Sequence, residues 1–180
     1  MHQSTKKLAE LSLFTAVAFL FSYIESLFPL PIPFPGIKLG LANLIIVIIL
    51  YRNGFAAAFS VSMIRNLLNA LTFGSLFGLF YSLAGSILSL VAMAALAKLF
   101  QDKISVITVS AIGGILHNFG QFIVAIALVG FDAILHYFPF LYFAGLIAGI
   151  LIGVFGKLCL ARLPHKTDFP KNKKTPTAQQ

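Results

Sequence analysis

Residues 76–97, LFGLFYSLAGSILSLVAMAALA, decide the fold, because this stretch is long, apolar and free of charged side chains. The hydrocarbon core of a bilayer is about 30 Å thick, and an α-helix needs about 20 apolar residues to cross it. Gly74 and Ser75 precede the stretch and Lys98 follows it, so both ends carry a turn or charge signal. The stretch therefore predicts a membrane-spanning helix.

The rest of the chain has the same character. Of its 180 residues 59% are hydrophobic and 10% are charged, whereas about a quarter of the residues in soluble domains are charged. A backbone in lipid must satisfy its own hydrogen bonds, which favours helices. We expect an all-α polytopic membrane protein, a bundle of six transmembrane helices. The expected spans are residues 8–28, 37–51, 55–73, 76–97, 105–129 and 139–160.

The basic residues predict the orientation. The chain has 13 Lys and Arg against 5 Asp and Glu, and with six spans most basic residues fall on one side, at Lys6, Lys7, Arg52, Lys98, Lys103 and the tail. The positive-inside rule then places both termini in the cytoplasm. The location of the basic residues at the ends of the spans and in the tail argues against a nucleic-acid partner and for a lipid bilayer. We expect residues 1–163 to form the membrane domain and residues 164–180 to be a basic, disordered cytoplasmic tail.

Two expected helices carry stripes of small residues, which allow helices to approach closely in a membrane. One stripe is Gly74, Gly78, Ser82 and Ser86. The other is Gly145, Gly149, Gly153 and Gly156. Both helices should therefore have tightly packed faces.

Polar side chains at membrane depth point to a binding site. They are costly in lipid and usually face a cavity or a partner. Pairs such as Arg65 with Asn69, and His117 with Gln121, are four residues apart and share a helix face. Three expected helices contribute to the predicted substrate-binding set, which is Lys38, Asn43, Arg65, Asn66, Asn69, His117, Asn118 and Gln121.

This set is cationic and rich in amides, so it favours an anionic guest or one with many hydrogen-bonding groups. Arginine in particular suits phosphate or carboxylate. Two alternatives stay open. Lys38 can reach the outer interface by snorkelling, and Glu25 or Asp132 can neutralise Lys38 or Arg65 within the protein.

Motifs for catalysis are missing from the sequence. It has no G-x-x-x-x-G-K-[ST] loop, no H-E-x-x-H and no DDxxD cluster that would hold magnesium against a diphosphate. The single Cys159 excludes an internal disulfide and a multi-cysteine metal site. We expect no catalytic residue, no metal and no cofactor, and a binder, carrier or scaffold in preference to an enzyme.

Four segments resemble a known bacterial family. They are PGIKLGLAN (35–43), SLAGSILSL (82–90), GGILHNFGQFIVA (113–125) and YFPFLYFAGLIAGILIG (137–153). These segments are similar to the Gx transporter family, which is also labelled heptaprenyl diphosphate synthase component I. The family is similar to S components of energy-coupling-factor transporters. This resemblance implies a six-helix protein that captures a small molecule from outside and works with separate coupling and ATPase subunits.

Two functions follow from the residues and the resemblance together. The first is a membrane substrate-binding or transport protein, like an S component, for a small anionic molecule. The alternative is a non-catalytic membrane subunit that anchors a prenyl (heptaprenyl) diphosphate synthase or an electron-transfer assembly. Its ligand would be an isoprenoid diphosphate, and its partner a soluble synthase subunit that carries the missing aspartates.

Overall fold

The computed structural model describes residues 2–27 and 40–163, which form helices and short turns with no strand among them. The all-helical class is confirmed for this part of the chain. In order, the elements are α1 (His2–Leu27), α2 (Leu41–Asn53), α3 (Phe55–Thr72), α4 (Leu76–Phe100), the 3-10 turn η1 (Gln101–Lys103), α5 (Val106–Val129), α6 (Phe131–Ile134), the 3-10 turn η2 (Leu135–Tyr137) and α7 (Phe138–Arg162).

Six of these helices correspond to the six expected spans, and four are long and apolar enough to cross a membrane. These four are α1, α4, α5 and α7. The helix α2 has 13 residues and is about 20 Å long, less than the hydrocarbon thickness. The helix α3 has 18 residues and carries Arg65, Asn66 and Asn69. The expected start of the second span at residue 37 lies outside the described residues.

The boundaries differ from the expected ones in three places. The helix α1 begins at His2, ahead of residue 8, and α4 continues past residue 97 to Phe100. Residues 130–138, which the sequence suggested were only a connection, contain α6 and η2. Hydropathy cannot separate a short helix from a loop when both are rich in aromatic and aliphatic residues.

The centre of the fold is α2. Its residues Ile45, Ile46, Val47, Ile48, Ile49 and Leu50 are all buried. A helix that is apolar on all sides is stable only when other elements surround it, and here α1, α3 and α7 pack around α2. The short helix is therefore enclosed by protein along its length.

Glycines allow α5 and α7 to pack with their backbones in contact. A Cβ atom on Gly114 of α5 would overlap the carbonyl oxygen of Gly145 on α7, and one on Gly149 would lie 2.6 Å from Ser110 O. Gly153 faces Ile107 in the same way. The tightly packed face predicted for residues 145–156 is thus present.

The stripe predicted on α4 is only partly correct. Gly74 and Gly78 are exposed, while Ser86 is buried. The close approach of α4 to α5 uses Gly85 instead, where a Cβ would lie 2.7 Å from His117 O. Small residues lie on more than one side of α4 in the sequence. Which of them form the contact depends on where α5 packs, and the sequence of α4 does not show this.

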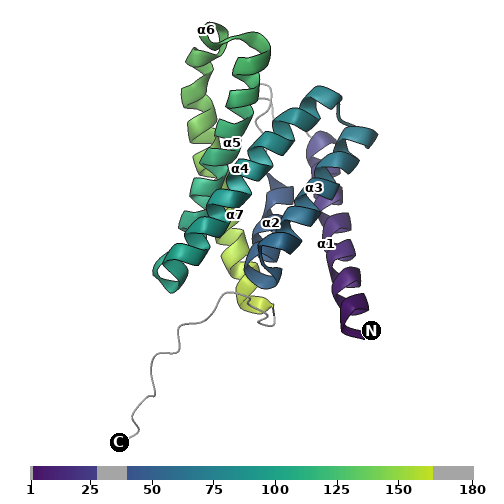
Figure 1. Cartoon of the computed structure of the whole chain (residues 1–180). Helices are drawn as coiled ribbons and strands as arrows, with labels where there is room; N and C mark the ends of the chain where they lie inside the picture. Colours follow the sequence, from purple (N-terminus) through teal and green to yellow (C-terminus); the bar gives the residue numbers. More distant parts are fainter. Residues whose placement is uncertain (1, 28–39, 164–180) are drawn as a thin grey trace, which may run out of the picture.

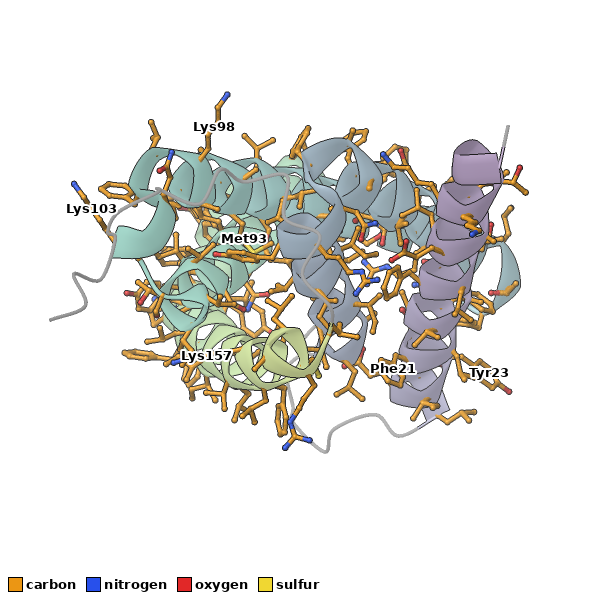
Figure 2. All side chains as sticks on the ribbon, turned by 90° about the horizontal axis from the view of Figure 1, so that it is seen from below. Phe21, Tyr23, Met93, Lys98, Lys103 and Lys157 are labelled. Atoms are coloured by element: carbon orange, nitrogen blue, oxygen red, sulfur yellow. The ribbon has the colours of Figure 1, made fainter. Side chains whose placement is uncertain are left out.

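The N-terminus and the end of α7 lie at the same end of the bundle, and α6 lies at the opposite end (Figure 1). Seen from the end that holds the start of α1 and the end of α7, the side chains of Lys98 and Lys103 project outward, and Phe21 of α1 points inward while Tyr23 points away (Figure 2). We call this end the basic end and the other one the α6 end.

Candidate ligand-binding site

A cavity of about 730 Å³ opens among the helices, with walls from α1, α2, α3, α4, α5 and α7. Cavities that hold small molecules have volumes of about 300–1,000 Å³. Seven of the eight predicted residues line it, and Lys38 lies outside the described residues. The seven are Asn43, Arg65, Asn66, Asn69, His117, Asn118 and Gln121.

Arg65 is the buried cation of this cavity. It is only 5% exposed and lies within α3, and its guanidinium is held by two amide oxygens. Nη1 donates to Asn43 Oδ1 at 3.3 Å, and Nη2 donates to Asn66 Oδ1 at 2.8 Å. The buried Nε has no hydrogen-bond partner. The arginine is thus oriented by neutral groups, and its Nε–H is left without an acceptor.

Glu25 does not form a contact ion pair with Arg65. No ion pair within 4 Å joins these two residues. The ion pair found in the described part of the chain is that of Arg52 with Glu10, at 2.8 Å. Glu25 Oε1 instead accepts hydrogen bonds from Gly40 N at 2.5 Å and Leu41 N at 3.1 Å. Its charge still attracts the Arg65 guanidinium from farther away.

The bonds of Glu25 explain how α2 begins. Gly40 has a φ of 77°, a left-handed conformation that suits glycine, and its residue type offers no side chain to cap the helix. The carboxylate from α1 therefore caps α2, where the helix dipole favours negative charge. Asp132, the other predicted partner, is exposed in α6 and does not line the cavity.

The amides on α3 have different roles. Asn66 is 1% exposed, and its Nδ2 donates to Ser86 Oγ at 3.0 Å and to Ser82 O at 3.4 Å. It therefore connects Arg65 to α4. Asn69 Oδ1 is buried without a partner, so it is an acceptor that a ligand can use.

The α5 wall is more strongly bonded within the protein. Gln121 Nε2 and His117 Nε2 are 3.1 Å apart, as their spacing of four residues predicts. Asn118 Nδ2 donates to Leu141 O at 2.7 Å, which makes Asn118 a bridge between α5 and α7. Asn118 lines the cavity, but its amide nitrogen already donates a hydrogen bond within the protein.

Several lining residues were not predicted as ligand contacts. Glu25 was expected only as a neutralising partner, and Tyr81 and Phe77 carried no signal inside an apolar stretch. Ser82 was expected only as a packing residue. The cavity thus has a polar part around Arg65 and an aromatic and aliphatic part toward the α6 end, where Phe77, Val129, Ile134 and Tyr137 line it.

The site offers charges and hydrogen bonds but no metal cluster. Within residues 2–27 and 40–163 no group of three or more His, Cys, Asp or Glu side chains could hold an ion. The chemistry that its side chains support is recognition, through one guanidinium, one carboxylate and several amides.

Comparison with known families places the chain. The sequence model of heptaprenyl diphosphate synthase component I matches residues 14–159. The chain belongs to this family. No curated protein and no solved structure matches it.

The matched range includes every predicted site residue and most of the helical bundle. It excludes the first part of α1, up to residue 13, and the chain after residue 159. The family resemblance seen in the sequence is therefore confirmed, and it extends over the cavity.

Proposed function

We propose that this protein is an integral membrane protein of the bacterial cytoplasmic membrane that binds a small molecule carrying an anionic group and moves it across the bilayer. Six helices would cross or enter the membrane, with both termini in the cytoplasm. The membrane domain would be residues 1–163, followed by a basic tail of residues 164–180. The position of Lys98 and Lys103 at the basic end, which holds the start of α1 and the end of α7, supports this orientation.

The observation that carries the proposal is Arg65. Arg65 is 5% exposed, two neutral amides hold its guanidinium, and its Nε has no partner. It is thus a buried charge without a contact counter-ion among the described residues. Such a charge costs several kcal/mol unless it is paired. An anionic ligand in the cavity would supply the pairing, and Arg65 and Asn69 would be its first contacts.

Binding of small anions by the purified protein in lipid nanodiscs tests the proposal. The probes are inorganic phosphate, pyrophosphate, acetate and citrate, and the readout is the melting temperature and isothermal titration. At least one probe should stabilise the protein, and Arg65→Gln should weaken its binding by at least about 10-fold, the scale of one charge-assisted hydrogen bond.

Arg52→Gln is the matched control, because Arg52 pairs with Glu10 outside the cavity. It should leave anion binding unchanged. The transport proposal fails if no probe binds, or if Arg65→Gln and Arg52→Gln have equal effects.

A second function is favoured by the family name, heptaprenyl diphosphate synthase component I. In this reading the protein is a non-catalytic membrane subunit, and a separate soluble subunit carries the aspartates that this sequence lacks. A hollow of about 540 Å³ at the basic end, lined in part by Lys7, Asn53 and Lys98, offers a docking place for such a subunit.

Affinity purification from native membranes separates the two functions. Recovery of a soluble synthase, lost on Lys7→Glu together with Lys98→Glu, supports the subunit role. Recovery of ATPase and coupling subunits supports transport by an energy-coupled complex. Purification of the chain alone contradicts both assemblies. In that case the protein would act as a carrier without partner subunits.

A further inference from the structure

The cavity contains one side chain of each charge, contributed by different helices. Arg65 comes from α3 and Glu25 from α1, and both line the cavity. They attract each other but are not joined by an ion pair within 4 Å in the described residues. Opposite charges that line one cavity without contacting each other are both available to a ligand bound there.

Each of the two charged groups has unused bonding capacity. Arg65 Nε is buried and donates to no partner. Glu25 uses Oε1 for both of its bonds, to Gly40 N and Leu41 N, and its Oε2 accepts no hydrogen bond from the described residues. An ionised carboxylate has about four acceptor sites, so Glu25 can take a donor at Oε2 without releasing α2.

The first turn of α2 fixes the spacing of the two groups. Arg65 donates to Asn43 in this turn, and Glu25 accepts from Gly40 and Leu41 at its start. Both charges are therefore anchored to the same short stretch of backbone. A ligand that spans them meets a preformed pair of contacts, which lowers the ordering cost of binding.

We infer that the ligand is a zwitterion, with a carboxylate or phosphate for Arg65 and an ammonium or other N–H donor for Glu25. This inference rests on the proposed ligand-binding function and narrows its substrate class. A simple anion would satisfy Arg65 but would be repelled by Glu25. A zwitterion satisfies both, so the buried Arg65 gains a counter-ion and the partly buried Glu25 meets a donor instead of a like charge.

Matched probe pairs test the inference, each with and without the amine. They are β-alanine and propionate, 4-aminobutyrate and butyrate, and phosphoethanolamine and ethyl phosphate, titrated into the full chain in nanodiscs of phosphatidylglycerol. In at least one pair the amine-bearing member should bind about 10-fold tighter or more. Arg65→Gln should weaken both members of that pair.

The direction in which Glu25→Gln changes the affinity of each probe tests the inference. Glutamine keeps an acceptor for Gly40 N and Leu41 N, so α2 stays capped. The variant should weaken the amine-bearing probe about 10-fold and strengthen its partner without the amine. The control Glu10→Gln removes the other carboxylate of α1, which lies outside the cavity, and should change neither affinity.

Three outcomes contradict the inference or its basis. If simple anions bind as tightly as zwitterions, or if Glu25→Gln strengthens every probe, the ligand is a plain anion and the proposed function stands without the inference. If no probe binds, the proposed function fails as well.

A lipid headgroup can supply the same zwitterionic chemistry as a free molecule. Repeating the titration with phosphatidylethanolamine added to the nanodiscs distinguishes these sources. Competition by this lipid, absent in Glu25→Gln, shows that the site takes a headgroup. Unchanged binding shows that it takes a free zwitterion.

Discussion

Arg65 Nη1 donates to Asn43 Oδ1 across 3.3 Å, which links the middle of α3 to the first turn of α2. The acceptor is a neutral amide at the place where a carboxylate would neutralise the guanidinium. Because the amide orients Arg65 without removing its charge, the arginine keeps its attraction for an anion. Under the proposed function, Asn43 would therefore serve ligand binding as well as the contact between α2 and α3.

Replacing this amide by a carboxylate should lower the affinity of the site for anions. In Asn43→Asp the new charge pairs with Arg65 and repels the ligand, so the affinity for the anion that binds the wild type should fall by at least about 10-fold. Asn43→Ala removes only the orienting bond and should cost less. Isothermal titration of both variants in nanodiscs measures the difference.

Asn53→Asp makes the same substitution at the other end of α2 and serves as the control, since Asn53 lines the hollow at the basic end and not the cavity. Asn53→Asp should leave the anion affinity within about 2-fold of the wild-type value. Equal losses in Asn43→Asp and Asn53→Asp would mean that the change in net charge, and not the position, controls binding.

The contact between α5 and α7 should tolerate no side chain at Gly114. A Cβ there overlaps Gly145 O, so Gly114→Ala should force the backbones apart and lower the free energy of unfolding by about 1–3 kcal/mol. Unfolding in mixed detergent micelles, followed by circular dichroism, measures the loss.

Ala127→Val provides the comparison on the same helix. Ala127 is exposed, so a larger addition there meets no protein and should change stability by less than about 0.5 kcal/mol. A Gly114→Ala protein as stable as wild type would mean that α5 and α7 lie farther apart than described.

The residues of the site that the sequence predicts are those whose burial in lipid is costly. Arg65, His117 and Gln121 stand out because apolar residues surround them in the sequence, and lipid leaves them few places except a common cavity. Helix periodicity then pairs His117 with Gln121, as observed. These inferences need only local sequence, and the structure brings the same residues together.

The parts that could not be predicted depend on distant residues. The helix α2 begins at Leu41 because a carboxylate sixteen positions earlier, Glu25, caps it. No local pattern records that contact. In the same way, no local pattern records that α7 brings Leu141 O within 2.7 Å of the Asn118 amide.

The ion pair of Glu10 and Arg52 should contribute more than a surface pair. Its side chains are only 19% and 12% exposed and meet at 2.8 Å, so water screens them less than exposed charges. A double-mutant cycle with Glu10→Gln and Arg52→Gln should give a coupling of about 1 kcal/mol, at the upper end for exposed pairs. Thermal unfolding of the four proteins measures it, and additive losses would show that the two charges do not interact.

The proposed orientation predicts which end of the bundle is reached from outside the cell. Asp132 in α6 and Lys103 in η1 are both exposed, at opposite ends of the bundle. In a Cys159→Ser background, Asp132→Cys should react with a membrane-impermeant maleimide in intact cells. Lys103→Cys should react only after the cells are opened. The physical reason is that Lys98 and Lys103 belong to a basic end, which the positive-inside rule retains in the cytoplasm. The reverse labelling pattern would mean that the protein has the opposite orientation in the membrane.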